Sequence, residues 1–535
     1  MKPVTPFSKV FSVFVLCILF LLNCQSPEEI TEDAPDQCAD FNVFYTALVD
    51  QQYTGNCSAI DDLVDAYLDR NTAPQGCAIG IVYDNEIYYL KGYGKAQLTP
   101  DRNFTYATPS AVGSISKTLT ALGILKLVEG GYIRDLRDRA HLYLPSGTII
   151  DGPTVHELLG HGVGISREPN WDDDVDVEDL SYLSGAPHPG ADYLVVMDIF
   201  NAWPTTPLGP GQGAYSNAGY TILGGMIDGI TRNEVETIPA YTGVEGYEQY
   251  IYRVVGEDAG MYSMCINTHW RFNDILNMAT GYRADSEIEF TAASDETPGN
   301  GPAGWRGPAG GWAMTIGDLC RLMIAMNTND IVNEDLMEEM TTANYELIDH
   351  DELTPTGLIY GLGVLKAEAL GGPYVLHLGN IDGYSARYNY WPDRGLGVAI
   401  LINEESTGER PESLRGLSMD LADLFSGSTL PCPVIAHAGM ESKNIDYIKT
   451  VQSIASKSRN QYSTITNAWL EELTKSEEGK KMMKALEMGD VLTFTGLADT
   501  LLNQRRNKAK NKKIDEDNSS LNEIQNSPIN KEGRY

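Results

Sequence analysis

The sequence is poor in basic residues, in cysteine and in long apolar runs, and each shortage excludes a class of protein. Lysine and arginine number 39 against 74 aspartates and glutamates, which gives a formal net charge of −35 over 535 residues. A chain this acidic repels phosphate backbones and anionic lipid surfaces, so we expect no nucleic-acid partner. Hydrophobic residues still make up 42% of the chain, enough for most of it to build a core.

The apolar run nearest the N-terminus, 10–22, follows Lys2 and Lys9 and is shorter than the ~20 residues of a membrane-spanning helix. Such a run is typical of a secretory signal. It ends in Leu21-Leu22-Asn23-Cys24, which resembles a bacterial lipoprotein signal, although its asparagine departs from the usual small residue. We therefore expect an exported cell-envelope protein, held at the membrane only by a lipid on Cys24 and facing the periplasm or the exterior. Plain signal cleavage is the alternative.

The eight cysteines are widely and irregularly spaced, without a Cys-x-x-Cys pair, so a zinc site is not expected. Export permits disulfides, and Cys38 with Cys57 is one candidate pair. Cys320 stands in an apolar stretch, 319–326, which indicates a buried thiol. The acidic cluster at 172–179 lacks the spaced Asp-x-Asp-x-Asp-Gly pattern of a calcium loop. We therefore expect neither a metal nor a cofactor.

Sequence patterning divides the chain into five parts. We expect a signal peptide at 1–24, a tether at 25–59, a folded domain at 60–427, a helical extension at 428–505 and a disordered, polar tail at 506–535.

Strand patterns occur near both ends of the folded domain, at 78–83, 87–90, 374–377, 384–391 and 397–402. The first two flank Asp84-Asn85, which is typical of a hairpin turn. A helix is predicted over 114–129, and 150–300 is richer in loops and short helical patterns. Strands at both ends with helices between them predict one sheet that is interrupted by a helical insertion.

Ser114-Ile115-Ser116-Lys117 is the only Ser-x-x-Lys in the chain. At the start of a helix this spacing places Lys117 on the same side as Ser114, one turn on. A serine hydroxyl needs an adjacent base to act as a nucleophile, and a lysine can serve if burial keeps it neutral. The helix N-terminus adds a backbone N–H where an oxyanion would form. Because Ser-x-x-Lys also arises by chance, an ordinary helix surface is the alternative.

Tyr215-Ser216-Asn217 lies about a hundred residues further on, in a loop rich in glycine and proline. Functional side chains are often presented on such loops. The phenol of Tyr215 could shuttle a proton between the serine and a leaving group. Asn217 offers both a donor and an acceptor to a substrate amide.

A third motif, His377-Leu378-Gly379, ends a predicted strand. Gly379 would let a substrate lie close along the strand edge. The backbone N–H of Asn380 could complete an oxyanion hole with that of Ser114.

The order Ser-x-x-Lys, Tyr-Ser-Asn, His-x-Gly resembles the serine β-lactamase and penicillin-binding superfamily, in its class C-like branch. The resemblance covers about 60–425 and implies an α/β fold of the β-lactamase/transpeptidase kind, in which an antiparallel sheet is flanked by helices with a largely helical insertion lobe. Further stretches that are similar to this family are 127–131, 142–145, 154–161, 308–312 and 360–363.

The resemblance implies a serine hydrolase that forms an acyl-enzyme on Ser114, with Lys117 and Tyr215 handling protons. Tyr-Ser-Asn with His-x-Gly is most similar to serine D-Ala-D-Ala carboxypeptidases, so the substrate is expected to be a small peptide, such as a peptidoglycan stem peptide, or an ester. Carboxylesterases and β-lactamases share much of the pattern. A penicillin-binding envelope protein that is acylated without turnover is a further alternative.

Two histidines depart from the pattern of this family. His377 stands where β-lactamases usually carry lysine, and if the substrate has a free carboxylate, the imidazolium of His377 is placed to meet it. The alternative is a neutral histidine that hydrogen-bonds the Ser114 or Tyr215 network. His161 is followed by Gly162, where the family usually has a serine before the glycine, and we interpret it as structural rather than catalytic.

Overall fold

The computed structural model describes residues 50–432 with the exception of 51–52, 71–75, 100, 145–151, 166–207, 234, 236–237, 239–240, 242–245, 267–277, 285–289, 293–306, 349–354, 382, 405–413 and 428. These residues belong to the unit Asp36–Gly439. The predicted lipidation site Cys24, the acidic cluster at 172–179 and nearly all of the predicted helical extension lie outside the described residues.

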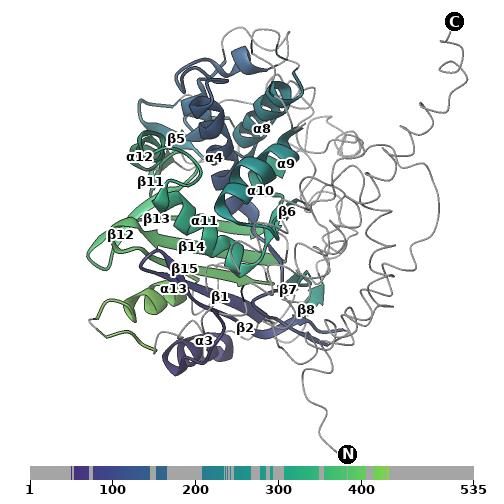
Figure 1. Cartoon of the computed structure of the whole chain (residues 1–535), viewed down its shortest axis with the longest axis vertical. Coiled ribbons are helices and arrows are strands. Elements are labelled where there is room, and N and C mark those ends of the chain that lie inside the picture. Colours follow the sequence, from purple (N-terminus) through teal and green to yellow (C-terminus); the bar gives the residue numbers. More distant parts are fainter. Residues whose placement is uncertain are drawn as a thin grey trace, which may run out of the picture. The chain divides into compact units, whose positions relative to one another are not determined.

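Ten of the described strands form one sheet at the centre of this unit (Figure 1). In the order in which they lie side by side, they are β3 (Arg102–Asn103), β2 (Glu86–Gln97), β1 (Gly76–Tyr83), β15 (Leu396–Ile402), β14 (Tyr384–Trp391), β13 (Gly372–Ile381), β12 (Leu365–Ala369), β11 (Pro355–Tyr360), β10 (Tyr345–Ile348) and β5 (Gln212–Ala214). All neighbouring strands are antiparallel except β10 and β5, which are parallel. The prediction of an antiparallel sheet therefore fails at this edge, where β5 enters from the insertion lobe.

The predicted hairpin is confirmed in β1 and β2. Asp84 and Asn85 form its turn with φ values of 55° and 60°, the left-handed conformation that a two-residue hairpin loop requires and that Asn and Asp tolerate. Because β1 is central, its side chains are buried on both faces of the sheet, and it reads as a continuous apolar run rather than an alternating one.

Helices cover both faces of the sheet (Figure 1). One face packs against α3 (Ser58–Arg70) and α13 (Leu414–Asp423), and the other packs against α11 (Ile316–Thr328). The helices α4 (Ser116–Glu129), α8 (Asn217–Thr231) and α10 (Gly307–Gly310) pack together beside the sheet. The described residues also contain α5 (Val155–Leu159), α9 (Gly246–Ile251), α12 (Glu334–Thr342), η2 (Gly113–Ile115), η3 (Ala140–Tyr143), η4 (Tyr252–Glu257) and η7 (Pro392–Arg394).

Two small sheets accompany the large one. The first contains β4 (Ser110–Ala111), β9 (Trp312–Met314) and β6 (Cys265–Ile266), and the second pairs β7 (Tyr282–Ala284) with β8 (Phe290–Ala292). The pairing of β4 with β9 matters for function because β4 leads directly into the turn that carries Ser114.

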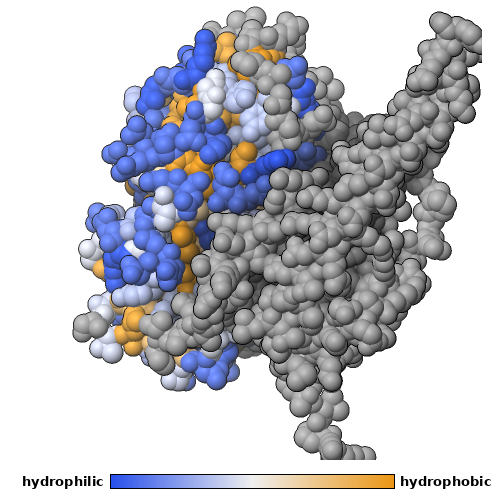
Figure 2. Space-filling model, in the orientation of Figure 1, coloured by the Kyte–Doolittle hydropathy of each residue, from blue (hydrophilic) through white to orange (hydrophobic). Residues whose placement is uncertain are grey.

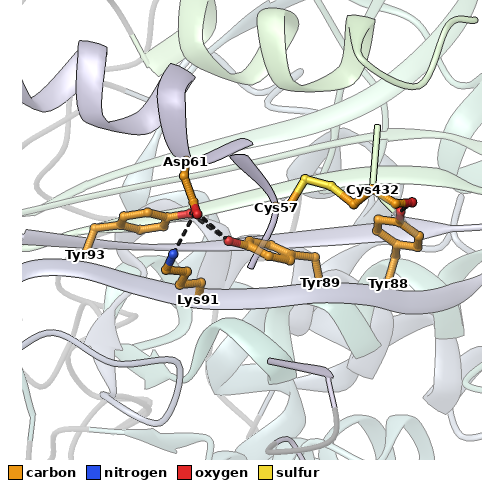
Figure 3. The surroundings of a disulfide bond; sticks show 7 residues. All are labelled: Cys57, Asp61, Tyr88, Tyr89, Lys91, Tyr93 and Cys432. Carbon is orange, nitrogen blue, oxygen red and sulfur yellow. Dashed lines mark hydrogen bonds and ion pairs between the residues drawn. A yellow bond between two sulfur atoms is a disulfide. The ribbon is translucent and has the colours of Figure 1, made fainter. Parts of the chain in front are cut away.

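A disulfide between Cys57 and Cys432 joins the start of α3 to the segment that follows α13 (Figure 3). The predicted Cys38–Cys57 pair is therefore wrong, because Cys57 is bonded to a cysteine 375 residues further along the chain. Beside the disulfide, the Asp61 carboxylate accepts hydrogen bonds from Tyr89 Oη at 2.9 Å, Lys91 Nζ at 2.8 Å and Tyr93 Oη at 2.7 Å. These bonds attach α3 to β2. Cys320 is a buried free thiol, as predicted.

The face shown in Figure 2 is largely hydrophilic over the helices beside the sheet. Among the described residues, no helix is both long enough and apolar enough to cross a membrane. Large apolar side chains are exposed at a few described positions, namely Leu98, Leu142, Leu358 and Leu378. Leu378 belongs to the third sequence motif.

Candidate active site

Ser114 lies in the tight turn η2, between β4 and the first residue of α4. The predicted single helix over 114–129 therefore begins with a 3₁₀ turn. The adjacent Ser116 fixes this turn, because its hydroxyl donates to Gly113 O at 2.7 Å and accepts from Trp312 N at 3.1 Å. Ser114 itself is partly exposed at the end of a buried helix, which is the placement that a nucleophile requires.

Lys117 is fully buried, and its amine lies within hydrogen-bond distance of three oxygen atoms. Its Nζ is 3.1 Å from Ser114 Oγ, 2.7 Å from Asn217 Oδ1 and 2.7 Å from Ala309 O. Asn217 is the first residue of α8 and Ala309 lies in α10. The structure thus brings Ser114, Lys117 and Asn217 together across 100 residues of sequence.

Tyr215 lies between β5 and α8, with its ring centroid 4.8 Å from Lys117 Nζ. A second ring, that of Tyr220, has its centroid at 5.7 Å from the same atom. Aromatic faces stabilise a cation at such distances. The predicted site residue Tyr215 therefore contacts the lysine that is paired with Ser114.

Gly379 packs against the backbone that precedes Ser114. A Cβ added at Gly379 would overlap Val112 O and would lie 2.7 Å from the carbonyl carbon of Val112. The glycine is therefore needed inside the chain itself, because the nearest backbone is that of Val112. The expectation that a substrate lies close along this strand edge stays a prediction. This glycine allows β13 to approach the turn that holds the nucleophile.

We expect the Gly379→Ala variant to lower kcat/KM for an activated ester by about 100-fold, because a displacement of ~1 Å at a reacting group costs that much. Gly372→Ala is the matched control, since Gly372 lies in the same strand and has no atom within 4 Å of an added Cβ. Steady-state hydrolysis and near-UV circular dichroism check the result. Full activity in a folded Gly379→Ala variant would show that this packing does not position Ser114.

The Asn380 backbone lies beside Gly113, the residue before Ser114. Gly113 has a φ of +49°, and a Cβ on it would be 2.9 Å from Asn380 N. The close approach brings the backbone nitrogen of Asn380 near the turn that contains Ser114, as an oxyanion hole between these two residues would require.

His377 is buried, with 1% of its surface exposed, and both ring nitrogens have partners within the protein. Nδ1 lies 2.7 Å from Leu378 O, and Nε2 lies 2.9 Å from Tyr360 Oη. Because a carbonyl only accepts, Nδ1 carries the hydrogen and Nε2 accepts from the Tyr360 hydroxyl. This is the hydrogen-bonding pattern of a neutral imidazole.

Burial, and to a lesser degree the charge of Lys117, lower the pKa of His377 to about 3. Burial disfavours a charged imidazole, and a neighbouring cation disfavours it further. The ring is therefore neutral near pH 7. The expectation that a charged His377 meets a substrate carboxylate is wrong, and the alternative of a neutral histidine in the site's hydrogen-bond network is supported instead.

His161 is buried against the aromatic rings of the site. Its ring centroid lies 4.3 Å from that of Tyr215 and 4.5 Å from that of Tyr360. Its Nδ1 accepts a hydrogen bond of 3.1 Å from Ser216 N, which fixes the loop between Tyr215 and Asn217. These contacts agree with the structural role that we predicted for His161.

Comparison with known proteins identifies the family of this arrangement. The family model described as Beta-lactamase matches residues 60–422. The chain belongs to the Beta-lactamase family. This confirms the resemblance to serine β-lactamases and penicillin-binding proteins that the three motifs indicated, and it confirms the β-lactamase/transpeptidase fold.

The relatives are distant. The chain is 26% identical over 343 residues to beta-lactamase-like protein 4 of Dictyostelium discoideum, a match of 59% of this chain and 54% of that protein. It is also 26% identical over 341 residues to penicillin-binding protein 4* of Bacillus subtilis, covering 62% and 68%. The octameric penicillin-binding protein homologue from Pyrococcus abyssi superposes with a TM-score of 0.53 at 24% identity, over 70% of this chain and 78% of that one. The chain thus spans about half the length of the Dictyostelium relative.

The sequence did not predict a role for three residues of the site in this Beta-lactamase family member. They are Ala309, whose carbonyl holds Lys117, Tyr360, which donates to His377, and Tyr220, which lies beside Lys117. Ala309 and Tyr360 fall in the family-like stretches 308–312 and 360–363. Similarity to the family in those stretches was the one indication that these residues belong to the site. The local sequence does not indicate which distant side chain each residue contacts.

Proposed function

We propose that the chain is a serine hydrolase that cleaves an amide or ester through an acyl-enzyme on Ser114. The observation that carries the proposal is the set of contacts around Lys117. Lys117 can act as the base once its amine has lost its proton, and such a neutral amine has two N–H bonds and one lone pair. Asn217 Oδ1 and Ala309 O, each 2.7 Å from Nζ, accept the two hydrogens. The lone pair is then left for the hydroxyl of Ser114 at 3.1 Å.

The acylation step follows from this arrangement. Lys117 takes the Ser114 proton as the Oγ attacks the substrate carbonyl, and the carbonyl π electrons move onto its oxygen. The backbone N–H groups of Ser114 and Asn380 stabilise that oxyanion. When the tetrahedral intermediate collapses, the bond to the leaving group breaks and the proton passes from Lys117, directly or through Tyr215, to the leaving group. Water then attacks the acyl-enzyme by the same proton path in reverse.

Membership of the Beta-lactamase family supports the acyl-transfer chemistry. A second candidate, acylation by penicillins without turnover, is favoured by the likeness to penicillin-binding protein 4*. The two candidates differ only in how quickly water reaches the acyl-enzyme, so one experiment addresses both.

The test is intact-mass analysis of the full chain during incubation with p-nitrophenyl esters, benzylpenicillin and a cephalosporin. We expect one acyl group per chain, mapped to the peptide that contains Ser114, which appears and then decays as product accumulates. A penicillin adduct that forms at Ser114 and persists would favour the second candidate. A folded chain that neither acquires an adduct nor releases product with any compound would contradict the proposal.

A further inference from the structure

Part of the edge of β13 beside Ser114 has no partner strand within the part of the chain that the structure describes. β12 pairs with β13 only along Gly372–Leu376, whereas β14 pairs with it from Val375 to Ile381. Among the described strands, none pairs with the second edge of β13 beyond Leu376. An extended ligand can add to such an edge, and a group bound there lies next to Gly379 and the Ser114 turn.

The β13 side chains that border this edge, those of His377, Leu378 and Asn380, carry no charge near pH 7. His377, on one face of β13, is neutral because its two nitrogens are taken by Tyr360 and by the Leu378 carbonyl. Leu378, on the opposite face, leaves 37% of its surface exposed and has no polar atom in its side chain. Asn380 follows on the same face as Leu378 and is exposed and uncharged.

Arg387 is paired with Leu378 across β14, but it is buried and its Nε donates to Asn389 Oδ1. Lys117, whose charge acts on His377, also faces inward. It is fully buried and directs its hydrogen bonds to Ser114, Asn217 and Ala309. A substrate carboxylate on the β13 edge would therefore have to give up its hydration without an ion pair from His377, Leu378 or Asn380, which is unfavourable. The net charge of −35 adds a general repulsion of anions.

We propose that the substrate group bound along β13, next to the scissile bond, is uncharged and in part apolar. Resting on the proposed function, this names the substrate class as neutral esters or amides rather than peptides that end in a free carboxylate at that position. Leu378 is then a specificity-determining residue, and Tyr360 is a positioning residue that holds His377 neutral.

The test uses two acyl-glycyl thioesters that differ in one group, a thioglycolate leaving group with a free carboxylate and its methyl ester. We expect kcat/KM of the wild-type chain to be at least about tenfold higher for the methyl ester, which is the effect of one unpaired charged hydrogen-bonding group. Equal values, or a preference for the carboxylate, would overturn the inference. Failure of both thioesters to acylate Ser114 would instead overturn the proposed function.

Two isosteric variants separate the role of Leu378 from a general effect of mutation. Leu378→Thr supplies a hydroxyl that a carboxylate can accept from, whereas Leu378→Val supplies a methyl group in the same place. We expect the Thr variant to raise the carboxylate-to-ester ratio of kcat/KM by about tenfold over the Val variant. Identical ratios in the two variants would show that Leu378 does not contact the leaving group.

Discussion

Replacing Ser114 with alanine is expected to abolish the acyl adduct and to lower kcat/KM by at least about 10⁴-fold for any substrate that the chain hydrolyses. Removal of the Oγ leaves no atom at 3.1 Å from Lys117 Nζ that can form the acyl bond. Any remaining hydrolysis would have to come from oxyanion stabilisation and substrate binding alone, which are weak without a nucleophile.

The fold should tolerate the Ser114→Ala change, because Ser114 is partly exposed and the turn is held by Ser116. Ser426→Ala is a suitable control, since Ser426 is an exposed serine in the segment that follows α13. Intact-mass analysis and stopped-flow hydrolysis give the two readouts. If the Ser114→Ala variant still acquires the acyl adduct, another residue must be the nucleophile, and the proposed function loses its basis.

The local part of this site could be predicted from sequence alone. Ser114 and Lys117 are three residues apart at a helix start, so helical geometry places them together whatever the rest of the chain does. The hairpin of β1 and β2 was predictable for the same reason, because Asp84-Asn85 specifies a tight turn locally.

The state of His377 could not be predicted from the sequence, because it depends on residues from separate elements. The ring is neutral mainly because the elements packed around β13 bury it, and also because Tyr360, on β11, donates to it and the charge of Lys117 on α4 lowers its pKa further. A strand pattern that places His377 near the site contains no information about these partners. The same holds for the Cys57–Cys432 bond, whose cysteines are 375 residues apart.

Some strands escaped detection because their patterns are weak. β12, with the sequence Leu365-Lys366-Ala367-Glu368-Ala369, consists of residues that favour helices. β10 and β5 are short, and each is stabilised by its neighbours in the sheet rather than by its own composition. β5, which the sequence did not predict, matters for function. It ends at Ala214, so its place at the edge of the sheet positions Tyr215 in the site.

Replacing Lys117 with arginine or methionine is expected to lower the acylation rate by about 10³-fold or more, since general-base activation of a nucleophile contributes on this scale. Arginine keeps the positive charge but cannot be deprotonated in a protein, and methionine keeps the approximate shape without the amine. If Lys117 acts as the base, both variants fail alike. If it acts only as a cation that stabilises negative charge, Lys117→Arg should keep much more activity than Lys117→Met.

The comparison requires a correction for stability, because both variants disturb buried hydrogen bonds. Lys117→Met removes the donor that lies 2.7 Å from both Asn217 Oδ1 and Ala309 O. Each buried acceptor left without a donor lowers the free energy of unfolding by about 1–3 kcal/mol. Lys126→Met, in the same helix but with its amine on Glu129 and Ile331, controls for loss of a lysine from α4. Acylation should be timed by mass spectrometry at a temperature where thermal unfolding shows all variants folded. An arginine variant that acylates within tenfold of the wild type would contradict the assignment of Lys117 as the base and leave Tyr215 as the group to test.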